Sequence, residues 1–228
     1  IQGGEVTGSI DESIRHAMTK FSHIHFPATI LSRDRLVRMG EDPKNIYVVG
    51  CPSIDVIVET PILDRSIVEN YLGIDLEIHT LLMIQHPVTT ELSDSYDQIK
   101  QTIDAIKEVG VQTVVLLPNN DAGYSKIIDY IKLSNMKWFP SLKGDIFINL
   151  YRNVSAIIGN SSSGIHETPT IGIPAINIGN RQMGRERAKN VIDVANDKKS
   201  IVLAIMKVLH DNDFIESLVN IKNPYGIG

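Results

Sequence analysis

The chain has 228 residues, 43% of them hydrophobic and 21% charged, which is an ordinary composition for a globular protein. Its net charge of −5 disfavours a nucleic-acid partner, because nucleic-acid-binding proteins present a basic surface. The sequence contains no run of about 18 apolar residues and so predicts no membrane partner. The single cysteine, Cys51, excludes an internal disulfide and fits a reducing cytoplasm, and we interpret it as a small packed residue.

Short apolar, β-branched runs alternate with amphipathic runs of helical period along the chain. Repeated strand–helix–strand units predict a parallel sheet with right-handed crossovers, and continuous apolar runs indicate that helices cover both sheet faces. The predicted strands are 23–26, 46–50, 81–86, 113–118, 137–140, 156–159, 175–178 and 191–194. The predicted helices are 10–21, 30–39, 64–72, 94–108, 123–133, 145–153, 164–171, 198–210 and 213–221.

A domain boundary is expected within residues 55–61, which divides the chain into residues 1–57 and 58–228. The second part has enough strands and helices for a complete Rossmann-like domain, whereas the first has too few strands for a sheet with its own core. The chain opens on Ile1 and a glycine turn, with neither a methionine nor a signal peptide. We therefore expect it to be the interior of a longer protein.

The most distinctive motif is the serine-rich stretch 159–167, which directly follows the apolar run 156–158. Ser161, Ser162 and Gly164 open a predicted helix, where hydroxyls and free backbone N–H groups can bind phosphate. Glu167, in the first turn, can accept hydrogen bonds from ribose hydroxyls. An ordinary serine-rich helix cap is the alternative interpretation.

Two further predicted strands end in polar groups. His86 follows the strand that begins at Leu81, and Asn119 follows the next strand. In parallel sheets, ligands bind beyond the carboxyl ends of strands, where a histidine can donate to phosphate or transfer a proton. A structural histidine and a simple Asn-rich turn remain the alternatives.

Charged residues gather in two other places. Asp11 and Arg15 are four residues apart and share a helical face, which suits either proton transfer or a solvated surface. Arg181 lies in the loop 179–187 and could clamp a diphosphate with its planar fork, unless the loop is simply a mobile surface segment. We find no Cys/His metal spacing and neither a GxGxxG nor a P-loop motif, so we expect no metal and no cofactor.

Together these motifs resemble the hydrolysing UDP-N-acetylglucosamine (UDP-GlcNAc) 2-epimerases of sialic-acid-type sugar pathways. The resemblance covers essentially the whole chain, and the order and spacing of the motifs match. It is carried by Gly-Gly-Glu-x-x-Gly-x-Ile-Asp-Glu-Ser-Ile-Arg-His (3–16), Gln-His-Pro-Val-Thr-Thr (85–90), Pro-Asn-Asn-Asp-Ala-Gly (118–123), Gly-Asn-Ser-Ser-Ser-Gly-Ile (159–165) and Gly-x-Arg-Gln-x-Gly-Arg-Glu (179–186).

The resemblance implies an α/β fold of the GT-B type, with two Rossmann-like domains, parallel sheets and the active site in the cleft between them. Residues 1–57 would be the C-terminal portion of an incomplete N-terminal domain, and residues 58–228 the UDP-binding domain. The implied catalytic positions are Gln2, Asp11 and His86. The implied substrate-binding positions are Arg15, Asn119, Ser161, Ser162, Gly164, Glu167 and Arg181.

The implied reaction converts UDP-GlcNAc and water to N-acetylmannosamine and UDP by elimination followed by hydration. The sequence departs from the family in three respects. Gln2 replaces a catalytic glutamate, the N-terminal strands are missing, and Ile227 stands where the family usually has aspartate, just before a missing C-terminal tail. A catalytically inactive UDP-sugar-binding protein and a GT-B glycosyltransferase are the alternatives. The resemblance also implies a cytoplasmic homo-oligomer, dimer or tetramer, with contacts through helices 10–21 and 30–39.

Overall fold

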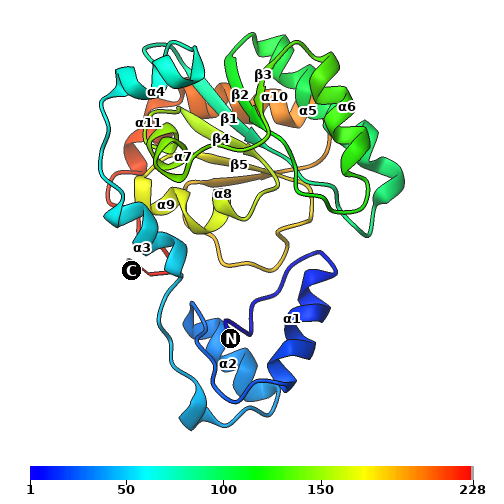
Figure 1. Cartoon of the computed structure of the whole chain (residues 1–228), viewed down its shortest axis with the longest axis vertical. Coiled ribbons are helices and arrows are strands. Elements are labelled where there is room, and N and C mark those ends of the chain that lie inside the picture. Colours follow the sequence, from blue (N-terminus) through cyan, green and yellow to red (C-terminus); the bar gives the residue numbers. More distant parts are fainter. Residues whose placement is uncertain (227–228) are drawn as a thin grey trace.

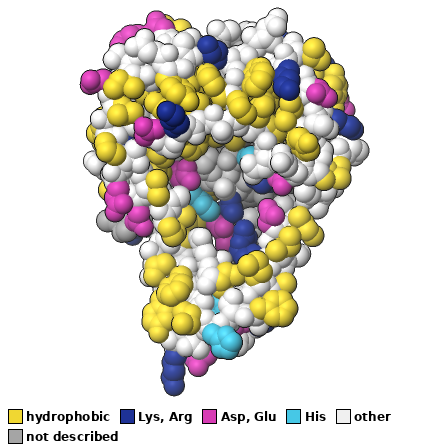
Figure 2. All heavy atoms as spheres, in the orientation of Figure 1, with side chains coloured by type: hydrophobic (Ala, Val, Ile, Leu, Met, Phe, Trp, Pro, Cys, Tyr) yellow, Lys and Arg dark blue, Asp and Glu magenta, His cyan; other side chains and the backbone are white. Residues whose placement is uncertain are grey.

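The computed structural model describes residues 1–226, so the predicted importance of Ile227 lies outside the described residues. Figure 1 shows a small lobe, residues 1–50, below a large lobe, residues 60–226, with a helix between them. The small lobe contains α1 (Asp11–Lys20), α2 (Ile30–Arg38) and the short 3-10 helix η1 (Pro43–Asn45). Figure 2 shows a hollow between the lobes in which acidic, basic and histidine side chains gather.

The predicted strands 23–26 and 46–50 do not form. In their place is one isolated parallel bridge between His25 and Ile46. The amide of His25 donates to Asn45, and the amide of Val49 donates to the carbonyl of Pro27. A parallel ladder would next need an N–H from Pro27, which proline lacks, so the pairing stops there.

The large lobe is built on one sheet in which every neighbouring pair of strands is parallel, with the order β3-β2-β1-β4-β5-β6. The six later strand predictions are confirmed within a few residues. The strands are β1 (Thr80–Ile84), β2 (Gln112–Leu116), β3 (Lys137–Phe139), β4 (Ala156–Gly159), β5 (Ala175–Ile178) and β6 (Val191–Val194). The other elements are α4 (Arg65–Leu72), η2 (Leu92–Asp94), α5 (Ser95–Val109), α6 (Tyr124–Leu133), α7 (Gly144–Tyr151), α8 (Ser163–His166), α9 (Thr168–Ile171), α10 (Lys198–His210) and α11 (Asn212–Ser217).

Helices cover both faces of the sheet, as the continuous apolar runs predict. Leu81 and Met83 of β1 face a cluster with α5, α6 and α10, whereas Leu82 and Ile84 face a second cluster with α4 and α7. Because side chains alternate along a strand, one five-residue strand contributes to both cores. The central strands β1, β2, β4 and β5 are therefore buried on both sides, and functional groups can gather at their ends.

Two helix predictions need correction. The continuous helix predicted over 164–171 is two short helices, α8 and α9, because Pro169 cannot donate a backbone hydrogen bond to the preceding turn. The sequence analysis also missed α3 (Pro52–Glu59), which joins the lobes. Its signals are a proline at the first turn and buried Ile54 and Ile57 three residues apart. The expected boundary between residues 57 and 58 falls inside this helix.

Gly159 sets the distance between β4 and β1 at the edge where the site forms. Its φ is +133°, and a Cβ there would lie 2.0 Å from the carbonyl oxygen of Ile84. Both the backbone angle and the contact exclude a side chain. We predict that Gly159→Ala will lower the free energy of unfolding by more than about 1 kcal/mol. Denaturant unfolding of this chain measures the change.

Gly144→Ala is the matched control. A Cβ at Gly144 would meet nothing within 4 Å, and the residue begins α7. Since alanine is a better helix former than glycine, this variant should be neutral or slightly more stable. Equal destabilisation by both substitutions would contradict the packing argument.

Candidate active site

A pocket of about 430 Å³ lies beyond the carboxyl ends of β1, β2 and β4. Strand order reverses between β1 and β4, since the chain continues from β1 to β2 on one side and from β4 to β5 on the other. Ligands of open α/β sheets bind at such a point, and the volume suits a small-molecule ligand. The lining residues are Ile84, His86, Leu116, Leu117, Asn119, Pro140, Ser141, Leu142, Phe147, Ser161, Ser162, Ser163, Glu167 and Arg181.

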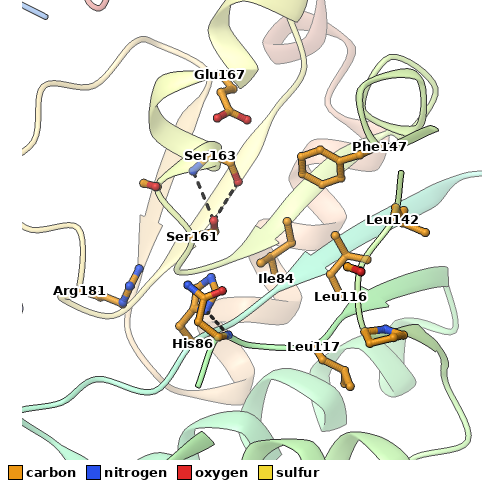
Figure 3. A pocket seen from close by; sticks show the side chains of 14 residues that line it. Ile84, His86, Leu116, Leu117, Leu142, Phe147, Ser161, Ser163, Glu167 and Arg181 are labelled. Carbon is orange, nitrogen blue, oxygen red and sulfur yellow. Dashed lines mark hydrogen bonds between the residues drawn. The ribbon is translucent and has the colours of Figure 1, made fainter. Parts of the chain in front are cut away.

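The pocket has a polar end and an apolar wall (Figure 3). Arg181 and His86 lie on one side, and Phe147, Leu142 and Leu116 line the other. An elongated ligand with a charged end and a flat ring matches this division.

His86 lines the pocket. Its Nδ1 accepts a hydrogen bond from the backbone N–H of Asn119 at 3.2 Å, so Nε2 carries the proton of the neutral ring. Burial and, second, the positive charge of Arg181 lower the pKa of His86 to about 4. At neutral pH the ring is therefore an uncharged N–H donor. Asn119 contributes its backbone to this arrangement and also lines the pocket.

Arg181 supplies the permanent positive charge. One of its nitrogens donates to the carbonyl of Asn160 at 3.2 Å, and another lies 4.0 Å from the carboxylate of Asp121. Burial lowers the pKa of Arg181, and the negative charges of Asp11 and Asp121 oppose this shift. The guanidinium is thus held at the pocket by a backbone contact, with the carboxylate of Asp121 at 4.0 Å.

The serine-rich stretch 159–167, called the serine loop below, does not lead into the long helix expected at 164–171. Ser161 and Ser162 line the pocket, and the Ser161 hydroxyl accepts from the Ser163 hydroxyl at 2.9 Å. Since α8 has only four residues, its dipole is small, and this loop can attract an anion mainly through its hydroxyls. Gly164 is buried and does not line the pocket; a Cβ there would touch Ala175 of β5 at 3.6 Å.

Glu167 lies at the opposite side of the serine loop from His86 (Figure 3). Burial raises the pKa of Glu167, although the nearby charge of His166 and a hydrogen bond to Ser53 oppose the shift. Its carboxyl group faces the pocket (Figure 3). It can therefore bind vicinal hydroxyls of a ligand.

Asn160 orders the polar end, although the sequence analysis assigned it no role. Its side-chain oxygen accepts from the His86 amide at 2.7 Å, and its side-chain nitrogen donates to the His86 carbonyl at 2.8 Å. Its own carbonyl accepts from both Arg181 and Gln182. One buried amide residue thus joins the ends of β1 and β4 to the loop 179–187.

The predicted residues of the small lobe lie outside the pocket lining. Gln2 and Asp11 are exposed, and Asp11 accepts a hydrogen bond from Ser9 at 3.0 Å. Arg15 donates to the carbonyl of Glu5, which occupies part of its guanidinium. The N–H of Gly8 donates to the carbonyl of Arg181 at 3.1 Å and so brings the start of α1 to the edge of the pocket.

Sequence reasoning also missed a buried ionic cluster between the lobes. Glu5 accepts from His166 at 2.7 Å and from Arg185 at 2.9 Å. Burial opposes ionisation of Glu5, but the hydrogen bond and charge of His166 and the charges of Arg185 and Arg15 lower its pKa to about 2. Burial would lower the pKa of His166, but Cys51 and Glu5 raise it. No local pattern could find contacts between residues 161 and 180 positions apart.

Residues 1–226 contain no cluster of three or more His, Cys, Asp or Glu side chains arranged to hold a metal ion. Over the same range, none of the helices has the length and apolar character needed to cross a membrane.

Comparisons with known proteins identify the family of the chain. The family described as UDP-N-acetylglucosamine 2-epimerase matches residues 1–228, and the chain belongs to that family. It is 36% identical over 210 residues to a UDP-N-acetylglucosamine 2-epimerase of Neisseria meningitidis, covering 91% of this chain and 55% of the relative. It is 34% identical over 232 residues to a UDP-N,N'-diacetylbacillosamine 2-epimerase (hydrolyzing) of Legionella pneumophila, covering 100% and 60%. The chain thus spans little more than half of these relatives.

The fold matches a solved structure of UDP-GlcNAc 2-epimerase from Neisseria meningitidis bound to UDP-GlcNAc. The TM-score is 0.82 and the identity 21%, with 100% of this chain and 66% of the other covered. The predicted α/β class of the GT-B type, with a parallel sheet and an incomplete N-terminal part, is confirmed.

The lowered pKa of His86 has a consequence for stability. An unfolded histidine has a pKa of about 6.5, so between that value and the folded value the unfolded chain binds more protons. The contribution of His86 to stability is therefore complete above about pH 6.5 and is lost as the pH falls toward 4. We predict that His86→Gln will flatten this fall, by an amount on the order of 3 kcal/mol across the window.

Denaturant unfolding of the parent chain and of the variant at several pH values measures the difference between their slopes. His166, whose pKa is raised, changes stability with pH in the opposite direction. This contribution is present in both proteins and therefore cancels in the difference between the slopes. The exposed His23 provides the control, and His23→Gln should keep the parent slope. Parallel curves for the parent and His86→Gln would contradict a buried, neutral His86.

Proposed function

We propose that this chain carries the nucleotide-sugar site of a hydrolysing UDP-GlcNAc 2-epimerase, which converts UDP-GlcNAc and water to N-acetylmannosamine and UDP. The observation that carries the proposal is the pocket that combines His86, Arg181 and the serine loop with an apolar wall in a member of the epimerase family. Residues 58–228 form the UDP-binding domain in this proposal, and residues 1–57 belong to the N-terminal domain.

The chemistry of UDP fits the division of the pocket. The uracil ring lies against Phe147 and Leu142, and the ribose hydroxyls donate to Glu167. The diphosphate receives hydrogen bonds from His86 Nε2–H, from the hydroxyls of Ser161 and Ser162, and from Arg181. A neutral donor beside a fixed cation suits an anionic leaving group, because the anion is stabilised as its charge develops.

The reaction runs in two stages. The C2 proton of the sugar is removed while the C1–O bond to UDP breaks, which gives 2-acetamidoglucal and UDP. Water then adds at C1, and a proton returns to C2 on the other face. The C2 proton is weakly acidic, so a positioned base is required. Asp11 is the carboxylate that the small lobe offers beside Arg181.

The hydrolysing branch is supported by the Gln-His-Pro-Val-Thr-Thr motif at residues 85–90 and by the name of the Legionella relative, which includes the word hydrolyzing. The relatives' names also include a diacetylated sugar, so the 4-position of the sugar is a point at which the substrate could differ from UDP-GlcNAc.

One observation favours a second candidate, a UDP-sugar-binding protein without turnover. Gln2 stands where the family resemblance implies a catalytic glutamate, and an amide does not exchange a proton as a carboxylate does. Gln2 is an exposed residue of the small lobe.

Proton NMR of UDP-GlcNAc in D₂O, with the protein expressed from its complete reading frame, separates the two candidates. The expected result is release of UDP together with N-acetylmannosamine deuterated at C2. UDP binding without turnover of UDP-GlcNAc or its 4-acetamido-6-deoxy analogue would reject the epimerase and support the binding protein. Exchange without net release of UDP would reject the hydrolysing branch.

Arg181 should dominate UDP affinity, because it is the cation among the residues that line the pocket. We predict that Arg181→Ala weakens UDP binding roughly tenfold to a hundredfold, as expected for about 1.5–3 kcal/mol from a hydrogen bond to a charged group. Isothermal titration calorimetry of this chain with UDP measures the loss. Arg33→Ala removes a half-exposed arginine of the small lobe and should leave the affinity unchanged. Equal affinities of parent and Arg181→Ala would reject this placement of the diphosphate.

A further inference from the structure

The joint between the two lobes is built around a buried carboxylate. Glu5 is only 8% exposed and comes from the segment before α1, whereas its partners His166 and Arg185 belong to the large lobe. A buried charge is costly unless it is paired and hydrogen-bonded, and Glu5 accepts its side-chain hydrogen bonds from His166 and Arg185 across the lobe boundary, with Arg15 of its own lobe at 4.0 Å. The carboxylate therefore stabilises one relative placement of the lobes.

Two other segments meet at the same point. The ring of Tyr225 packs on the ring of His166 with centroids 4.1 Å apart, and its carbonyl accepts from the amide of Cys51 at 2.9 Å. Asn223 donates to the carbonyl of His166 at 2.8 Å. The start of α3 and the C-terminal segment thus enclose His166 and hold the ring against Glu5.

Hydrogen bonds lead from this joint to the polar end of the pocket. Arg185 donates to the side-chain oxygen of Gln182, whose side-chain nitrogen donates to the carbonyl of Asn160 at 2.7 Å. Asn160 in turn holds both backbone groups of His86. Glu5 is therefore connected, through three side chains, to the histidine that faces the leaving group.

A second, shorter connection leads to Arg181. Gly8 lies three residues after Glu5, and its N–H donates to the carbonyl of Arg181 at 3.1 Å. A Cβ at Gly8 would lie 2.1 Å from the carbonyl oxygen of Asn180, so the two backbones are in direct contact. Asp11 follows Gly8 by three residues and begins α1. Placement of Glu5 thus sets the placement of Asp11 relative to Arg181.

We propose that Glu5 is a positioning residue, which fixes the proton-transfer end of the cleft, on α1, against the leaving-group end, on the loop 179–187. This inference rests on the proposed function for its effect on turnover. Glu5 contacts neither the pocket nor a reacting atom, and UDP is held by residues of the large lobe alone. Loss of its charge should therefore reduce turnover far more than UDP affinity.

Glu5→Gln in the protein from its complete reading frame tests this separation. The variant keeps the size of the side chain and removes the charge. We expect kcat to fall roughly tenfold to a hundredfold, since a displacement of about 1 Å can have that effect, while the Kd for UDP changes by less than about threefold. Glu5→Asp, which keeps the charge, should recover part of kcat. An unchanged kcat, or equal losses in kcat and UDP affinity, would overturn the proposal.

Glu41→Gln is the matched control. Glu41 also accepts from a histidine and a cation, His25 at 3.1 Å and Lys20 at 2.6 Å, but all three lie within the small lobe. This variant should keep kcat. The double variant Glu5→Gln/Arg185→Gln removes both buried charges and should recover thermal stability relative to Glu5→Gln while kcat stays low. Recovery of kcat together with stability would reduce Glu5 to a structural role and overturn the proposal.

Amide hydrogen exchange provides a measurement that does not depend on turnover. The Gly8 amide, protected by its bond to Arg181, should exchange faster in Glu5→Gln and at the parent rate in Glu41→Gln. If the parent protein lacks turnover in the NMR experiment, the proposed function fails, and this exchange rate still decides whether Glu5 holds the two segments together. If the Gly8 amide is equally protected in Glu5→Gln, the charge of Glu5 does not hold the two segments together, and the proposal is overturned.

Discussion

The polar end of the site depends on the side chain of Asn160. At the edge where β1 and β4 end, its amide pairs with both the N–H and the C=O of His86 and so replaces the next backbone pair of the ladder. Its carbonyl then receives Arg181 and Gln182. Without this amide, two buried backbone groups of His86 would lack partners, each at a cost of about 1–3 kcal/mol. This one residue therefore holds the backbone of His86 and receives a hydrogen bond from Arg181, and so places both at the polar end of the pocket.

A second constraint is how the positive charges of the cleft are neutralised. Arg15, Arg181 and Arg185 lie close together in a chain whose net charge is −5. Glu5 accepts a hydrogen bond from Arg185 at 2.9 Å, whereas Arg181 donates to the backbone carbonyl of Asn160 and lies 4.0 Å from the half-exposed carboxylate of Asp121. The joint therefore pairs Arg185 with a buried carboxylate and leaves the guanidinium of Arg181 able to bind an anion. The partners of each arginine, and not its residue type, therefore show whether it stabilises the structure, as Arg185 does, or can bind a ligand, as Arg181 can.

Local sequence patterns predicted the large lobe because its strands are short apolar runs between helices of clear period, and β1 to β6 all form where expected. The same reasoning failed for residues 23–26 and 46–50, where Pro27 removes the N–H that would extend the ladder. It found Ser161, His86 and Arg181 because each directly follows a strand. It missed Glu5 and His166 because their contact joins residues 161 positions apart, and a lone glutamate after two glycines shows no partner. Contacts between residues so far apart in the sequence depend on how the two lobes pack against each other.

In the proposed site, the residues at the leaving-group end are more buried and held by more hydrogen bonds than the residues at the proton-transfer end. Around the pocket, His86 is buried, its tautomer is set by Asn119, and Arg181 is held by a backbone carbonyl. Across the cleft, Asp11 and Gln2 are exposed, and Asp11 is oriented by a single hydroxyl. An exposed carboxylate keeps little positional or electrostatic advantage over water, because solvent screens it and leaves its rotamers free. In the proposed function, the binding of UDP therefore requires only the large lobe, whereas any step at C2 depends on the contacts that bring α1 to Arg181. Under the same proposal, the joint at Glu5, rather than the pocket, limits how well the two halves of the chemistry are aligned.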